Sequence, residues 1–184
     1  MMLDQYAAAA SLTSPAASFA AVAVALMVAH QVADHWIQSS HQAAHKGRPG
    51  WGGRLACAAH VASYTLTTTM AVLVVWLALD LPLTLPGVVL GQVISAVTHY
   101  WADRRAPLRN LAEKLRLGGF YRLGSPRPVR VLVVDEHGHV AYDADGAPVT
   151  VPVDAPALGT GAYALDQSWH WLWLGVAALV TALV

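Results

Sequence analysis

Charged residues are scarce in this chain, and cysteine is almost absent. Only 12% of the 184 residues are charged, about half the share that is typical of soluble domains. Because a surface in water needs charges and a surface in lipid does not, this scarcity favours a membrane protein. The single cysteine, Cys57, excludes an intrachain disulfide. Basic and acidic residues balance at eleven each, so no net charge suggests a nucleic-acid partner.

Apolar residues make up 56% of the chain and gather in segments long enough to cross a bilayer, which takes roughly 20 residues in a helix. We expect transmembrane helices at about 16–38, 55–79, 85–101 and 165–184. No Lys or Arg precedes the first segment, so we interpret it as a retained helix and not as a signal peptide. The predicted fold class is an all-α membrane protein, a four-transmembrane-helix bundle.

A long polar segment separates the third predicted span from the fourth. Leucines at helical spacing predict a short interfacial helix at 107–117. The runs 129–134, 140–142 and 149–153 read as strands joined by turns, so we predict a small β-rich insert. The expected organisation is therefore three helices in 1–104, a cytoplasmic loop in 105–162 and a fourth helix in 163–184.

Basic residues predict the orientation of these helices. All eleven Lys and Arg residues lie at 46–54 or 104–130, between the first and second or the third and fourth predicted spans. Loops rich in Lys and Arg stay on the cytoplasmic side of a membrane. We therefore expect a multi-pass protein of the cytoplasmic membrane with both termini outside.

Each predicted span carries a histidine near its cytoplasmic end, and three of the four carry an aspartate four residues from it. Residues four apart share one helix face. Spans one and three end at the cytoplasmic side while spans two and four begin there, so the topology brings these side chains to one depth. The seven residues are His30, Asp34, His60, His99, Asp103, Asp166 and His170.

Ionisable side chains inside a bilayer are costly unless they are paired, hydrated or bound to metal. Imidazole and carboxylate groups are ligands of zinc, iron and manganese, and helix bundles build metal sites from them. We therefore predict a divalent-metal site that holds one or two ions. An aspartate that is not a ligand would serve as general base, the candidates being Asp34, Asp103 and Asp166. A hydrogen-bonded polar network, or a proton or ion path, remains an alternative.

Further polar residues extend the cluster. Gln38 continues the polar line of the first helix, and Tyr64 shares a face with His60. Lys46, Arg104 and Arg105 are mainly topology signals, and the alternative is that they hold an anionic head group. Gln38, Lys46, Tyr64 and Arg104 are expected to support the metal site.

The combined motif consists of His30-x-x-x-Asp34-x-x-x-Gln38, Lys46, His60, His99-x-x-x-Asp103 and Asp166-Gln167-x-x-His170. It resembles the DUF3307 family, small bacterial and phage membrane proteins of unknown function, over all four predicted spans. The resemblance implies a bacterial inner-membrane location, adds Gln167 to the supporting residues and implies no activity. Residues 127–161 depart from the family pattern. A weaker similarity links the motif to predicted membrane-bound metal-dependent hydrolases by analogy alone.

Three functions are compatible with this sequence. The first is a metal-dependent hydrolase of a membrane lipid or another amphiphilic substrate. The second is an adaptor whose cytoplasmic insert binds a partner while the polar cluster holds the helices together. The third is a proton or cation transporter, which would form a homo-oligomer because four spans alone make a narrow path.

Overall fold

The computed structural model describes residues 14–124, 130–133, 137–152 and 159–184. These residues fall into two compact units, one within Met1–Leu111 plus Asp166–Val184 and the other within Ala112–Leu165.

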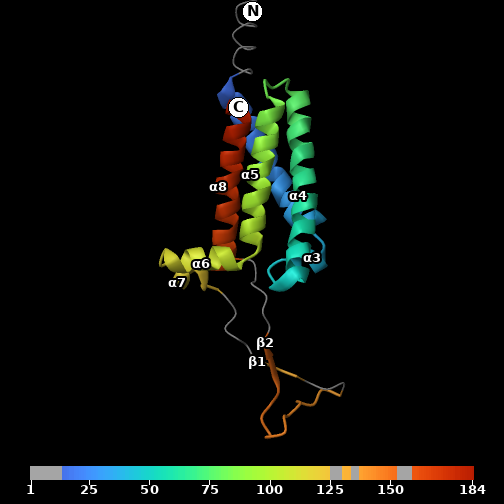
Figure 1. Cartoon of the computed structure of the whole chain (residues 1–184). Coiled ribbons are helices and arrows are strands. Elements are labelled where there is room, and N and C mark those ends of the chain that lie inside the picture. Colours follow the sequence, from blue (N-terminus) through green and yellow to red (C-terminus); the bar gives the residue numbers. More distant parts are fainter. Residues whose placement is uncertain (1–13, 125–129, 134–136, 153–158) are drawn as a thin grey trace, which may run out of the picture. The chain divides into compact units, whose positions relative to one another are not determined.

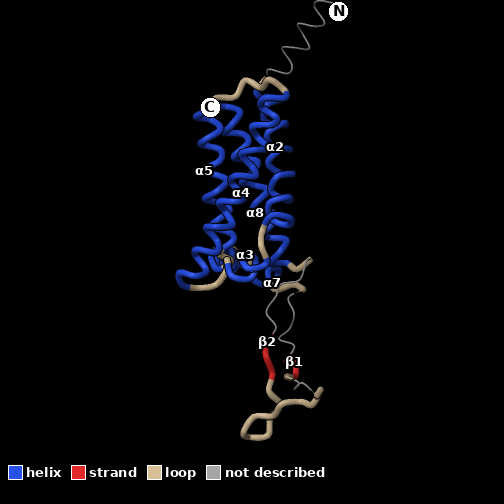
Figure 2. Tube along the Cα trace, turned by 90° about the vertical axis from the view of Figure 1, so that its right-hand side faces the viewer, coloured by secondary structure: helices blue, strands red, loops and turns tan. Residues whose placement is uncertain are grey.

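Long helices that run side by side make up the first unit (Figures 1 and 2). Helix α8 starts in the second unit and continues through the first. The elements of the first unit are α2 (Pro15–Val32), η1 (Ala33–Ile37), α3 (Ser40–His45), α4 (Gly50–Ala78), α5 (Leu85–Asp103) and α8 (Gly161–Leu183).

Local capping signals explain where two of these helices begin. Before α5, the hydroxyl of Thr84 accepts a hydrogen bond from the backbone N–H of Gly87 at 3.0 Å. Before α3, Ser39 and Gln42 form a capping box, in which each side chain accepts from the other residue's backbone N–H. Such caps satisfy backbone donors that the first helical turn leaves unpaired.

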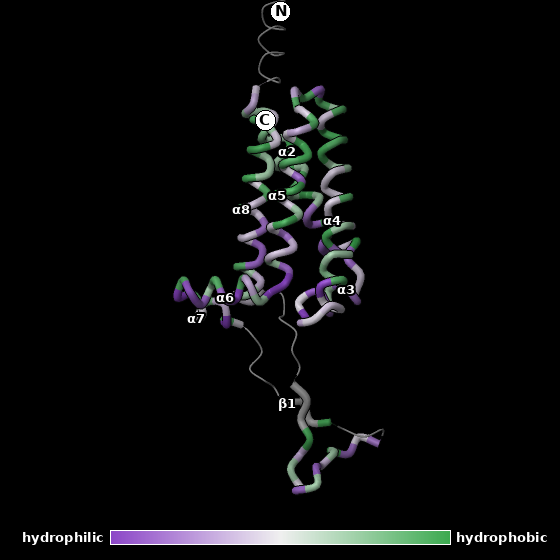
Figure 3. The backbone as a smooth tube through the Cα atoms, viewed as in Figure 1, coloured by the Kyte–Doolittle hydropathy of each residue, from purple (hydrophilic) through white to green (hydrophobic). Residues whose placement is uncertain are grey.

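An apolar core lies between α2, α4, α5 and α8, away from the polar end of the bundle. Figure 3 shows hydrophobic segments along these helices and hydrophilic segments near α3. The core draws on every long helix and on the α4–α5 turn, and consists of Val22, Leu26, Val72, Leu81, Leu83, Val88, Leu174, Ala177 and Ala178.

Gly91 sets the distance between α5 and α8. A methyl group at this position would lie 2.1 Å from Oγ1 of Thr181 and 2.8 Å from the backbone oxygen of Ala177. The threonine can rotate, but the helix backbone cannot move without disturbing the core.

Gly91→Ala is therefore expected to destabilise the protein by about 1 to 3 kcal/mol, the usual cost of overpacking. Gly175→Ala on α8 is the matched control, because nothing lies within 4 Å of the added methyl group. That control should gain stability, since alanine is the better helix former. Thermal unfolding in detergent compares the two, and equal effects would contradict the packing argument.

The second unit contains short elements only. They are the C-terminal part of α6 (Ala106–Lys114), α7 (Gly118–Tyr121), β1 (Arg130–Leu132) and β2 (Thr150–Pro152). The strands pair antiparallel with Val131 opposite Val151. Near α7, Arg122 donates to a carboxylate oxygen of Glu113 at 2.6 Å.

The prediction of four transmembrane helices is wrong. Among the described residues, two helices are long and apolar enough to cross a membrane, at Pro15–Ile37 and Gly50–Ala78. The helices α5 and α8 fall short because they carry the polar residues of the cluster along with Gln92, Ser95 and Gln167. The same side chains that suggested a site lower the hydropathy of the helices that carry them.

The prediction of a β-rich insert is also wrong. The described residues are mostly helical, and those of the insert form only two strands of three residues each. The run 140–142 forms no strand; Tyr142 contributes one isolated bridge to Pro148. Parts of the other predicted runs and their first turn, at 129, 134–136 and 153, lie outside the described residues. Alternating valines favour extended backbone, but so few paired residues cannot form a layer of sheet.

Candidate metal centre

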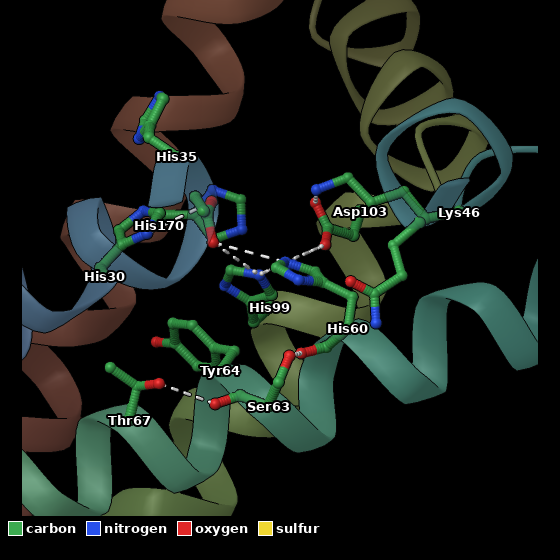
Figure 4. Close-up of polar contacts among 12 residues, drawn as sticks. His30, His35, Lys46, His60, Ser63, Tyr64, Thr67, His99, Asp103 and His170 are labelled. Carbon is green, nitrogen blue, oxygen red and sulfur yellow. Dashed lines mark hydrogen bonds and ion pairs between the residues drawn. The ribbon is translucent and has the colours of Figure 1, made fainter. Parts of the chain in front are cut away.

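The predicted cluster residues meet at the polar end of the first unit (Figure 4). His30 lies in the last turn of α2, and Asp34 lies in η1. His60 comes from the N-terminal part of α4, His99 and Asp103 from the end of α5. Each helix reaches the same end of the bundle because α2 and α5 finish where α4 starts. The four histidines and Asp103 are all buried.

A π-helical segment places Asp34. Over Ala33–Ile37 the backbone widens, and the N–H of Gln38 donates to the oxygen of Ala33 five residues earlier, at 2.9 Å. Such segments often occur at functional sites, where they redirect a side chain. Here Oδ2 of Asp34 lies 3.3 Å from Nδ1 of His30 while Oδ1 faces the histidines of α4 and α5.

Three ligand-type atoms form a nearly equilateral triangle. The Nε2 atoms of His60 and His99 are 3.0 Å apart. Oδ2 of Asp103 lies 3.2 Å from each of them. Ligands about 2.0 to 2.1 Å from a tetrahedral zinc ion lie roughly 3.3 to 3.4 Å from one another, so the triangle has nearly the size of one face of such a site. Two histidines and one carboxylate are also the ligand set of many non-haem iron sites.

Asp34 approaches the same point from η1. Its Oδ1 lies 3.3 Å from Nε2 of His60 and 3.6 Å from Nε2 of His99. Both Oδ1 of Asp34 and Oδ2 of Asp103 are buried and accept no well-formed hydrogen bond from any described residue. Buried carboxylate oxygens normally have such partners. These two oxygens and two nitrogens therefore converge on a common centre, where the two Nε2 atoms are also within hydrogen-bond distance of each other.

No family model, curated protein or solved structure matches this chain. The site is therefore interpreted from its own geometry.

Lys46 supports the outer oxygen of Asp103. Its Nζ donates to Oδ1 at 2.8 Å, which leaves Oδ2 directed at the two histidines. Burial alone would raise the pKa of Asp103, but its contacts with His99 and with the ammonium group of Lys46 outweigh it and hold the pKa below its ordinary value. Asp103 is therefore ionised, and the ionised carboxylate is the form that can serve as a metal ligand.

Arg104 does not reach the cluster. Its guanidinium group donates to the backbone oxygens of Lys46 and Arg48, the latter at 2.7 Å. Arg105 donates in the same way to Ala43 at 3.2 Å. The role in holding an anionic group that was predicted for these arginines is thus replaced by a structural role. The two arginines attach α3 and the residues that follow it to the end of α5, and so position Lys46.

The remaining cluster residues lie beside the triangle. Nδ1 of His170 is 2.8 Å from the backbone oxygen of Asp166 and 3.6 Å from its carboxylate. The ring of His170 lies 4.3 Å from that of His99 and 4.9 Å from that of His30. Three overlapping groups could hold a metal ion: His60–His99–Asp103, His30–Asp34–His99 and Asp103–Asp166–His170.

Tyr64 packs against the metal-site histidines. Its ring stacks on that of His99 at 3.8 Å, and its hydroxyl forms a 2.6 Å hydrogen bond with Ser95. These contacts hold the His99 ring in place. Gln38 contributes a buried amide whose nitrogen has no hydrogen-bond partner among the described residues.

Gln31 is a site neighbour that the sequence analysis missed. Its side-chain amide donates to Gln167 at 3.3 Å, and Gln167 in turn lies 3.5 Å from the Asp166 carboxylate. In the sequence, its position directly after His30 was the available indication that Gln31 lies near the site. It was overlooked because adjacent helical residues do not share a face.

Proposed function

We propose that this protein is a membrane-bound metal-dependent hydrolase whose ion is held by His60, His99 and Asp103. The observation that carries the proposal is the convergence, within 3.0 to 3.6 Å, of two imidazole nitrogens and two carboxylate oxygens that accept no well-formed hydrogen bond from the described residues. Zinc is our first expectation, because three protein ligands and a water molecule are typical of zinc hydrolases. Iron or manganese suits the same ligand set.

Charge supports a cation at this position. The cluster contains three carboxylates, those of Asp34, Asp103 and Asp166, and among the described residues Lys46 brings one ammonium group to it, paired with Asp103. With neutral histidines the cluster has an excess of negative charge, which is costly in a buried site. A divalent cation offsets that excess.

Asp34 is assigned the role of general base. A divalent metal held by the three ligands would make a water molecule more acidic and so easier for a nearby base to activate at neutral pH. Asp34 takes the proton from the water as the oxygen attacks the ester, and the ester bond to the leaving alcohol breaks. The same proton passes to the alkoxide, so that water is added across the ester bond.

The setting of the site supports a membrane location. Apolar side chains of α4 point outward: Leu66 is 66% exposed and Leu77 is 80% exposed. Exposed apolar surface along a helix that is long enough to cross a bilayer suits contact with lipid. The segment between the two candidate spans carries Lys46 and Arg48, which favours a cytoplasmic position for this end of the bundle. A bacterial inner membrane remains our proposed location.

A groove beside the cluster supports an amphiphilic substrate. It has a volume of about 330 Å³ and is lined by Met27, Val28, Gln31, Val32, Trp36 and Trp171. Its walls are apolar except at Gln31, which follows His30 in sequence. A hydrocarbon chain of a lipid fits these walls, with its polar end toward Gln31 and the metal centre. Membership in the DUF3307 family also stays a proposal, supported by the spacing of the polar residues.

Metal analysis and an activity assay test this proposal together. Protein purified in detergent should contain at least one equivalent of a divalent metal, and His60→Ala protein should contain less. In mixed micelles the unmutated protein should cleave a long-chain p-nitrophenyl ester or bis(p-nitrophenyl) phosphate, and chelation should stop the reaction. Absence of bound metal would contradict the site, and metal without cleavage of either probe would contradict the hydrolase.

A further inference from the structure

His170 is a buried imidazole that the first metal position does not use. Its exposed fraction is 3%. Its Nδ1 lies 2.8 Å from the backbone oxygen of Asp166. A carbonyl oxygen only accepts hydrogen bonds, so Nδ1 carries the ring proton in the neutral form, and the lone pair is on Nε2.

The lone pair on Nε2 accepts no hydrogen bond from the described residues. Nε2 of His170 is buried and has no hydrogen-bond partner among the described residues. A histidine whose Nδ1 is fixed by a carbonyl group and whose ring lies against other histidines of a polar cluster has the arrangement of a metal ligand. A histidine that served only to join helices would be expected to pair both nitrogens.

Carboxylates lie beside the His170 ring, and Oδ2 of Asp166 is 3.6 Å from its Nδ1. Ligand atoms of His170, Asp166 and Asp103 all lie within 4.8 Å of one another. Asp103 also belongs to the triangle with His60 and His99. One carboxylate is therefore common to two possible ion positions, as is usual in helix-bundle sites that hold two metals.

We propose that the cluster holds a second divalent ion, bound by Nε2 of His170 and by Asp166, with Asp103 shared between the two ions. This inference rests on the proposed first position. His30 lies beside this second ion position. It is fully buried, neither of its ring nitrogens has a well-formed hydrogen bond in the described residues, and its ring is 4.9 Å from that of His170.

Two ions also account for the number of ligand-type residues. The triangle uses two histidines and one aspartate, and Asp34 is the base. His30, Asp166 and His170 would otherwise be three ionisable residues with no assigned role, and burying such residues is costly unless they are paired. A two-ion site assigns ligand positions to Asp166 and His170 and places His30 beside them.

Manganese loading tests the second position. Protein is stripped with a chelator, reloaded with Mn²⁺, freed of excess metal, and analysed by elemental analysis and electron paramagnetic resonance. We expect two ions per chain and the spectrum of an exchange-coupled pair. His170→Ala and Asp166→Asn should each retain one ion with an uncoupled spectrum. The Asp166→Asn substitution should disturb the fold less than His170→Ala, because the side chain of Asp166 is 28% exposed.

His41→Ala is the matched control, because His41 is exposed and stacks only on His45 among the rings of this region. It should retain both ions and the coupled spectrum. One ion per chain in the unmutated protein would overturn the second position and leave the first intact. Two ions in both His170→Ala and Asp166→Asn would overturn it as well, whereas no bound ion in the unmutated protein would also remove the proposed function.

Discussion

The Asp103→Asn protein is expected to bind zinc at least about 100-fold more weakly than the unmutated protein. Loss of a group that only supports a ligand typically costs 10- to 100-fold in metal affinity, and Asp103 is proposed as a ligand itself. An amide keeps the shape of the side chain but loses the negative charge that faces His60 and His99 at 3.2 Å. Equilibrium competition with a chromogenic zinc chelator measures the change.

Asp80→Asn is the matched control for this measurement. Asp80 is exposed in the turn between α4 and α5 and has a φ of 48°, which asparagine tolerates well. Zinc affinity should be unchanged in this variant. Circular dichroism should show the same helical content in both variants. Unchanged zinc binding by Asp103→Asn would show that the buried pair with Lys46 is structural and that the ion, if any, lies elsewhere.

Asp34→Asn is expected to keep the metal at the triangle and to lower the hydrolysis rate by about 100- to 10,000-fold, the usual contribution of a general base. An asparagine amide cannot accept the proton of the bound water. The Oδ1 atom of Asp34 lies 3.3 Å from His60 and 3.6 Å from His99, so its removal leaves the three proposed ligands in place. Metal content and turnover of the p-nitrophenyl probes are measured on the same preparation.

Two results would contradict this assignment. If the Asp34→Asn protein loses its metal together with its activity, Asp34 is a ligand and not the base. If it keeps both, another residue takes the proton. His41→Ala serves again as the control, because it changes an ionisable residue near the α3 segment without touching the cluster.

Part of the candidate site could be predicted because helix periodicity is local. The pairs His30–Asp34 and His99–Asp103 lie four residues apart, so each pair shares a face in any helix that contains it. The alternating direction of successive helices then brings both pairs to one end of the bundle. The distances of 3.3 and 3.2 Å within these pairs agree with that expectation.

The number of candidate membrane helices was overestimated for a related reason. Hydrophobic runs were joined across the polar residues of α5 and α8, and each helix was given the length of a span. In both helices the histidine and aspartate that attract attention also lower the apolar content. The β-rich insert failed because alternating valines indicate strand propensity, and pairing over many residues depends on partners that the local sequence does not specify.

By itself, the sequence determined which residue types are available and which of them share a helix face, because both depend only on composition and on the geometry of a single helix. Tertiary packing decided which atoms meet. It directed Oδ2 of Asp103 to His60 and His99 and brought Lys46 to the opposite oxygen. It also turned Arg104 away to the backbone of Lys46 and Arg48. These choices depend on how neighbouring helices approach and on the widened backbone at Ala33–Ile37, and no periodicity within one segment encodes them.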